Sequence, residues 1–156
     1  MKSIHDPRTR AEIIARINAL KPETAALWGK MTAYQMVKHC RLWEEMSLGR
    51  KKYKRGFVGF VFGRMALGRF LSDERPLPKN TPTLPDLIIR DEGDIAAEKA
   101  AWIEQLESYG DTPGPGMMHP FFGRLTGEQV GYLAYKHSDH HLRQFNHPSA
   151  DSSPDS

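Results

Sequence analysis

Hydrophobic positions recur every three or four residues in four stretches of the chain, which is the period of an amphipathic helix. The first stretch covers about residues 7–20, where Asp6 stands as an N-cap before Pro7 at the first helical position. The second covers about 32–48 and opens on the sequence TAYQ at 32–35, the pattern of a capping box. The pattern therefore predicts two helices in the first third of the chain.

Two further helices are predicted in the second half of the chain. Helical periodicity returns in the sequence DIAAEKAAWIEQLESY, which is followed by Gly110, and glycine commonly follows the last turn of a helix. A second capping box, formed by Thr126 and Gln129, opens a last helix that runs to about Phe145. Residues 111–125 are rich in proline and glycine, and they are predicted to form a loop.

The middle of the chain, from Gly49 to about Arg90, is less regular. A basic run at 50–55 gives way to the sequence GFVGFVFGRMALGRFL at 56–71, which is predicted to be helical in part despite its glycines. Four prolines then favour an extended backbone: Pro76, Pro78, Pro82 and Pro85. We expect a long connection between the second and third long helices.

Four long helices without convincing alternating strands predict an all-α fold, a four-helix bundle with a long crossover between helices two and three. Because short loops make neighbouring helices antiparallel and the long connection lets helices two and three run parallel, the expected order is up-down-down-up. A length of 156 residues predicts one domain, over residues 1–147. The polar composition of residues 148–156 predicts a disordered tail.

Composition indicates a soluble protein of the cytoplasm. Hydrophobic residues make up 39% of the chain and charged residues 26%, which is ordinary for a globular domain. The single cysteine, Cys40, leaves no intramolecular disulfide and fits a reducing compartment, where it is expected to be buried and inert. The sequence contains no signal-peptide core and no apolar stretch long enough for a membrane span.

The formal net charge of +3 is mild, and much of the excess comes from RKKYKR at 50–55, so nucleic acid is not an expected partner. The run and the apolar stretch after it also allow a membrane-surface interpretation, but this signal is weak, and solvated loop charge is the simpler interpretation. The apolar segment, with Arg64 and Arg69 inside it, is expected to cover the bundle or to form a dimer contact.

Three histidines on predicted inner faces carry the strongest chemical signal. His137 and His141 extend the apolar stripe of the last helix and lie about 40° apart, one turn above the other, so that both imidazoles can bind one ion. His39 lies in the apolar stripe of the second helix. Three neutral imidazoles in a core predict a divalent-metal site with an open position. The alternative is a set of hydrogen-bonded core histidines, and spacing alone leaves both open.

Other polar residues near this set are candidates for catalysis or binding. His140 is predicted to flank the metal ligands, and His119 to reach the open face; either histidine suits proton transfer near neutral pH. The alternative for His119 is a loop histidine that anchors its turn. Arg143 and Gln144 are candidates for binding the carboxylate of a substrate or thiol cofactor, or for orienting an imidazole. A plain surface pair is the alternative for these two residues.

Several motifs resemble those of a known superfamily. The sequences TAYQMVKHC, HPFFGRLT and YKHSDHHLRQF are similar to motifs of the DinB/YfiT-like superfamily of candidate metalloenzymes. The sequences DPRTRAEIIARI, ALWGKMTAYQM and DERPLPKNTPT resemble a subfamily within it that is known only as a domain of unknown function. The resemblance covers the chain from about Asp6 to Phe145.

This resemblance implies an up-down-down-up four-helix bundle in which His39, His137 and His141 hold a divalent ion, zinc or nickel first and iron or manganese as further choices. Relatives in the superfamily include S-transferases and isomerases that use low-molecular-weight thiols, and many members are homodimers. The expected function is metal-dependent activation of water or a small thiol for attack on a small-molecule substrate, as in an S-transferase or hydrolase. The alternative is a non-catalytic bundle that acts as a stress-associated binding or interaction protein.

Overall fold

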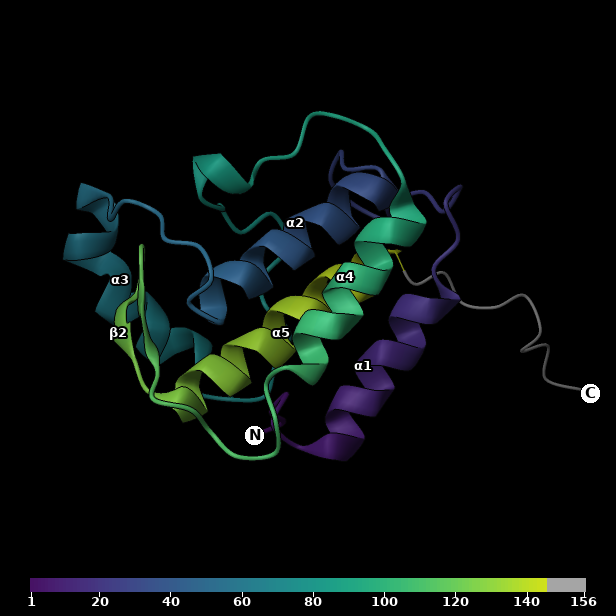
Figure 1. Cartoon of the computed structure of the whole chain (residues 1–156). Helices are drawn as coiled ribbons and strands as arrows, with labels where there is room; N and C mark the ends of the chain where they lie inside the picture. Colours follow the sequence, from purple (N-terminus) through teal and green to yellow (C-terminus); the bar gives the residue numbers. More distant parts are fainter. Residues whose placement is uncertain (146–156) are drawn as a thin grey trace, which may run out of the picture.

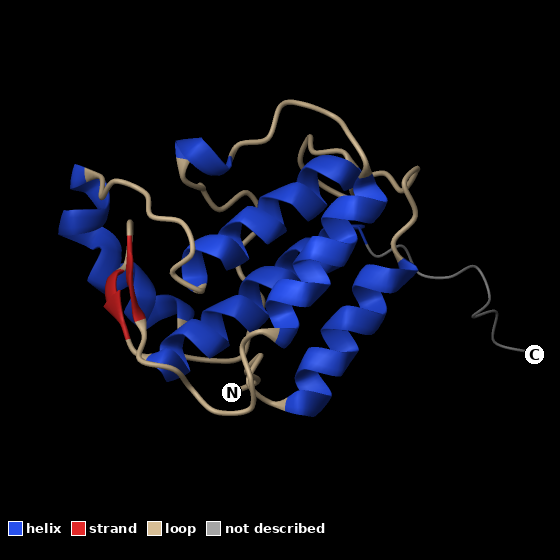
Figure 2. Cartoon of the chain, in the orientation of Figure 1, coloured by secondary structure: helices blue, strands red, loops and turns tan. Residues whose placement is uncertain are grey.

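The computed structural model describes residues 1–145, which are mostly helical and carry one small antiparallel sheet (Figures 1 and 2). The predicted tail at 148–156 lies outside the described residues. Within the described part, the elements in chain order are α1 (Pro7–Ala19), α2 (Ala33–Ser47), α3 (Phe57–Phe70), the short 3-10 helix η1 (Pro85–Leu87), α4 (Ile95–Glu107), β1 (Met117–His119), β2 (Gly123–Leu125) and α5 (Gly127–Phe145).

Side chains at the N-terminal ends fix where two of the long helices begin. The Thr32 hydroxyl accepts a hydrogen bond from the backbone amide of Gln35 at 3.2 Å, and the Gln35 side chain accepts one from the amide of Thr32 at 3.2 Å. Thr126 and Gln129 make the same reciprocal pair, at 3.2 and 3.0 Å. Both predicted capping boxes are confirmed, because each satisfies two backbone donors that the first helical turn leaves unpaired.

The hydrophobic core of residues 1–145 lies where α1, α2, α4 and α5 meet. Helix α2 packs against α4 and α5, and α1 packs against the same two helices from the other side (Figure 1). The residues at these contacts are almost wholly removed from water, with at most 3% of each exposed: Ile13, Ile17, Met36, Val37, Trp102, Leu106, Leu133 and Leu142. Cys40 belongs to this core and is fully buried, as predicted.

The helix expected within residues 56–71 is confirmed, and it forms α3. One local prediction was wrong in part. The predicted loop at 111–125 contains the hairpin of β1 and β2, in which Met117 lies opposite Leu125. Strands of three residues are too short to show an alternating pattern. Gly123, at the start of β2, has a φ of +81°, a left-handed conformation that favours glycine.

The long connection between α2 and α4 is held against α5 by polar side chains. The ammonium group of Lys136 is buried and donates to three backbone carbonyls, that of Phe70 at the end of α3 and those of Asp73 and Arg75 after it, at 2.6, 2.6 and 3.1 Å. Further along, the Leu77 carbonyl lies 3.2 Å from Nδ1 of His140. These contacts fix the connection beside the histidines of α5. None of the helices within residues 1–145 combines the length and apolar character needed to cross a bilayer.

Candidate metal centre

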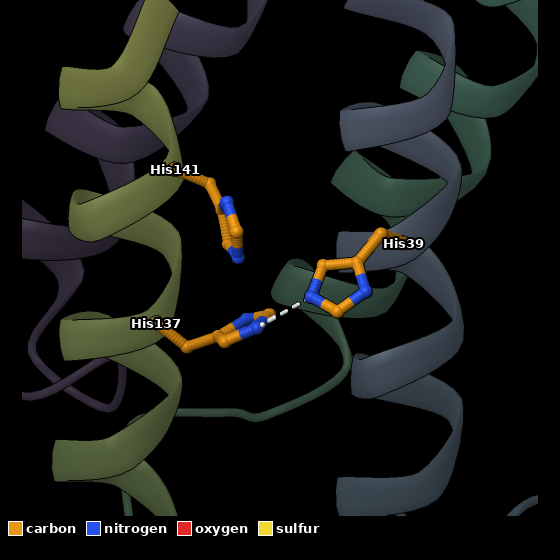
Figure 3. Close-up of side chains that lie close together, drawn as sticks. All are labelled: His39, His137 and His141. Carbon is orange, nitrogen blue, oxygen red and sulfur yellow. Dashed lines mark hydrogen bonds between the residues drawn. The ribbon is translucent and has the colours of Figure 1, made fainter. Parts of the chain in front are cut away.

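Three histidine side chains from two helices point toward one another in the interior (Figure 3). His39 comes from α2, and His137 and His141 come from α5. One ligand nitrogen from each ring lies within 4.8 Å of the other two, and the Nε2 atoms of His39 and His137 are 3.0 Å apart. Two nitrogens that each bind one ion at about 2.1 Å are at most about 4 Å apart, so this closest pair already fits a shared ion.

A backbone carbonyl fixes the tautomer of His39. Nδ1 of His39 lies 2.8 Å from the carbonyl oxygen of Leu87, the last residue of η1. Since a carbonyl only accepts, the Nδ1 proton is donated to it, and Nε2 carries a lone pair directed at the other two rings. The connection between α2 and α4 thus orients a candidate ligand on α2.

A side-chain amide fixes the tautomer of His141. Nδ1 of His141 lies 2.9 Å from Oε1 of Gln144, and Nε2 of Gln144 donates to the carbonyl of Trp28 at 2.7 Å. The second bond sets which end of the amide faces the imidazole, so His141 donates through Nδ1 and keeps its Nε2 lone pair free. The interpretation of Gln144 as a residue that orients an imidazole is confirmed.

His137 is held by an aromatic stack rather than by a hydrogen bond at Nδ1. The ring of Trp43 lies parallel to it, with centroids 4.6 Å apart and an interplanar angle of 17°. Its Nδ1 atom is buried and has no hydrogen-bond partner among residues 1–145. A buried polar atom without a partner costs free energy, so the position of this ring is not explained by hydrogen bonding alone.

Burial keeps all three imidazoles neutral. Burial is the largest cause that lowers the pKa of His39, His137 and His141 below the usual 6.5. The pKa values of His137 and His141 lie well below it. The charge of the neighbouring imidazoles lowers the pKa values of His137 and His141 further. A divalent ion needs ligands that are already deprotonated, so the set has the protonation state that metal binding requires.

The two histidines predicted to transfer protons each have a backbone partner. His119 accepts at Nδ1 from the amides of Phe121 and Phe122, at 3.1 and 3.2 Å, and burial lowers its pKa to about 4. His119 thus anchors the turn between β1 and β2, which is the alternative role predicted for it. Because Nδ1 accepts, the ring proton is on Nε2. His140 contacts the Leu77 carbonyl, and its ring lies 5.0 Å from that of His141. Their role in catalysis stays a prediction.

Arg143 faces α1 in an ion-pair network. Its Nε donates to Asp139 at 2.7 Å, and the other oxygen of that carboxylate accepts from Arg16 of α1, also at 2.7 Å. Its side chain is 54% exposed. Its predicted role in binding a thiol or substrate carboxylate stays a prediction.

The backbone carbonyls of Leu87 and Trp28 were missed by the sequence analysis. A carbonyl carries no residue-specific signal, and both lie in connections whose course the periodicity of the helices does not define. Only the tertiary structure brings them to the histidines.

A family model described as "Protein of unknown function (DUF1569)" matches residues 6–148. The chain belongs to this family. The matched range includes all three histidines of the candidate metal centre, so the DUF1569 region holds the complete set. No curated protein and no solved structure matches the chain. The function of this DUF1569 protein is therefore inferred from the geometry of the site.

Proposed function

We propose that this DUF1569 protein is a metal-dependent enzyme whose divalent ion is held by His39, His137 and His141. The observation that carries the proposal is the convergence of three neutral imidazoles, two of which donate their Nδ1 protons elsewhere and direct Nε2 lone pairs inward. A bound ion would turn water or a small thiol into a nucleophile at neutral pH. An all-imidazole set favours zinc or nickel, with iron or manganese as further choices.

The fold we propose is a DinB-like four-helix bundle in one domain, over residues 1–147. The mutual packing of α1, α2, α4 and α5 supports it, and so do the helix directions in Figure 1, where α2 and α4 run one way and α1 and α5 the other. In this arrangement α2 and α5 supply all ligands, and the connection after α3 covers them. A reducing, cytoplasmic setting suits the buried thiol of Cys40.

The residues around the ion have separate proposed tasks. His119 presents an Nε2 proton, and His140 lies beside His141, so each is a candidate to move a proton to or from a small substrate. Arg143 would bind the carboxylate of a small thiol after exchanging its bond to Asp139. Gln144, Leu87 and Trp43 position the ligands.

Elemental analysis of the full chain, purified without a metal-affinity tag and offered zinc or nickel, tests the metal site. About one ion per chain is expected for a single three-histidine site, with loss of that ion in His39→Ala and in His137→Ala. His5→Ala is the matched control, because His5 is a buried histidine outside the cluster, and its ring nitrogens contact the carbonyls of Gly110 and Gly127. The control should keep its ion. Circular dichroism checks that each variant is folded.

Two outcomes would separate the candidate functions. Absence of an ion in the wild-type protein, after zinc, nickel and iron have been offered, contradicts the metalloenzyme proposal and favours the non-catalytic binding protein. If the ion is present, a screen of electrophilic substrates with and without small thiols distinguishes an S-transferase from a hydrolase, because only the first needs the thiol.

A further inference from the structure

Helix α3 packs on the rest of the molecule through two glycines and one leucine. Its buried residues are Gly59, Gly63 and Leu67, at steps of four, so they form one stripe. A Cβ atom at Gly63 would lie 1.9 Å from the carbonyl oxygen of Phe121, and one at Gly59 would lie 2.7 Å from the Cα atom of the same residue. The helix therefore lies directly on the backbone of the turn between β1 and β2, where larger side chains do not fit.

The large apolar side chains of α3 point the other way, into solvent. At 100° per residue, most of them lie within an arc of roughly 140° opposite the glycine stripe. Phe57 is 82% exposed, and Met65 is 71% exposed. The exposed set is Phe57, Val58, Phe60, Val61, Phe62 and Met65. Contiguous apolar surface of this kind on a water-soluble protein marks an interaction site.

Positive charge surrounds this apolar face. Residues 50–71 contain seven lysines and arginines and no aspartate or glutamate. Five of the seven are exposed in the run RKKYKR just before α3, and the other two, Arg64 and Arg69, are exposed on the helix itself. The guanidinium of Arg55 lies 5.1 Å from the centre of the Phe60 ring, so charge and apolar surface are in direct contact.

We propose that α3 and residues 50–55 dock on the surface of an anionic bilayer. Phenylalanine, valine and methionine side chains would enter the boundary between headgroups and acyl chains, while lysine and arginine would bind anionic headgroups. The 14 residues of α3 are too few to span a bilayer, so the helix lies in the plane of the interface. Helix α3 lies at one end of the molecule, beside β2 and away from α1 (Figure 1).

Charge favours lipid over other occupants of this face. In a twofold dimer the same patch would meet itself and bring two sets of seven positive charges together, so a homodimer would use another face. The tail at 146–156 contains no large apolar side chain that would cover the phenylalanines. Nucleic acid would neutralise the basic run but would leave most of the aliphatic surface in water.

Co-sedimentation of the full chain with vesicles tests the proposal. One set of vesicles is phosphatidylcholine alone, and the other contains phosphatidylserine in addition. The protein should sediment with the anionic vesicles at least about tenfold more than with the neutral ones, because each basic residue near an anionic surface strengthens binding about fivefold. Binding of metal plays no part in this assay, so its result is independent of the proposed function.

Two variants separate the contributions of apolar surface and charge. Phe57→Ser/Met65→Ser removes exposed apolar side chains and should reduce sedimentation at least about tenfold, while Leu27→Ser/Ile88→Ser, exposed elsewhere, should not. Lys52→Glu/Lys54→Glu should likewise reduce sedimentation at least about tenfold. Its control, Lys21→Glu/Lys30→Glu, changes the net charge equally at two other exposed lysines and should bind like the wild type.

Three results would overturn the proposal. The first is failure of the wild-type protein to sediment with anionic vesicles, including the case in which it binds an oligonucleotide instead. The second is unchanged vesicle binding by the Phe57→Ser/Met65→Ser variant, which would mean that charge alone acts. The third is a wild-type dimer, seen by light scattering, that becomes a monomer in this variant, which would assign α3 to a contact between copies.

Discussion

Helices α5 and α3 depart from the usual distribution of polar and apolar residues in opposite directions. Helix α5 buries polar side chains, and α3 exposes large apolar ones. In α5 the buried polar side chains have hydrogen-bond partners, with the exception of Nδ1 of His137. The partnered residues are Lys136, Ser138, Asp139, His140, His141 and Gln144. In α3 the inner positions are taken by glycine because a backbone turn lies against them. Burial in both helices is decided by what the neighbouring segment offers, not by hydropathy alone.

The largest effect predicted for the polar interior is a pH dependence of stability at Glu44. This carboxyl on α2 is fully buried, contacts the hydroxyl of Tyr109 and accepts from Ser138 at 3.4 Å. Burial raises its pKa from the usual 4.5 to about 8. The folded state then keeps a proton that the unfolded state releases, so the free energy of unfolding falls as pH rises from about 4.5 to 8, by on the order of 5 kcal/mol.

Glu44→Gln isolates this contribution. Glutamine keeps the acceptor oxygen but does not ionise. The free energy of unfolding of the metal-free variant, measured with denaturant, should therefore lack the fall that the wild type shows over this pH window. Subtracting the two profiles removes the histidines, whose lowered pKa values reduce stability as pH falls below 6.5. Parallel profiles for the two proteins would show that Glu44 titrates as an ordinary carboxyl.

The next largest effect is expected at the glycine stripe of α3. Gly63→Ala places a Cβ against the carbonyl of Phe121, which cannot rotate away, and should destabilise the fold by roughly 3 kcal/mol. Gly68→Ala is the matched control on the same helix, since nothing lies within 4 Å of its added Cβ. It should stabilise by about 0.5–1 kcal/mol through helix propensity. Equal melting temperatures for the two variants would contradict the packing described for α3.

Local signals explain why the helices were predictable. Capping boxes at Thr32 and Thr126 and the apolar period behind them place α2 and α5 to within a residue or two. The extent of α3 was not predictable in the same way. Glycine counts against a helix, and only the turn at Phe121 makes Gly59 and Gly63 the fitting residues.

The candidate site was predictable in its ligands but not in its detailed geometry. Helical spacing predicts that His137 and His141 share a face, and the apolar stripe of α2 predicts an inward His39. That all three approach within 4.8 Å depends on how α2 and α5 cross, which no local pattern defines. The Leu87 and Trp28 carbonyls that orient the ligands come from distant connections, so they escaped prediction.

The hydrogen bond from His141 to Gln144 should affect metal affinity. Gln144→Met keeps the volume but removes the acceptor that holds Nδ1, and loss of such a partner typically weakens metal binding about 10–100-fold. Zinc titration against a competing chelator measures the change. The neighbouring Arg143→Met loses only the bond to Asp139 and should bind zinc like the wild type. If both variants bind equally, Gln144 does not position the ligand.

The smallest effect is expected where apolar side chains are exposed. Met65 is 71% exposed, so Met65→Ser removes little buried area and should change the free energy of unfolding by no more than about 0.5 kcal/mol. Two residues later, Leu67 is 3% exposed, and Leu67→Ala should cost about 2–4 kcal/mol because it opens a cavity beneath α3. Denaturant unfolding of both variants measures the contrast. A large loss in Met65→Ser would place that side chain in a buried contact, and the apolar face of α3 would then be part of the core.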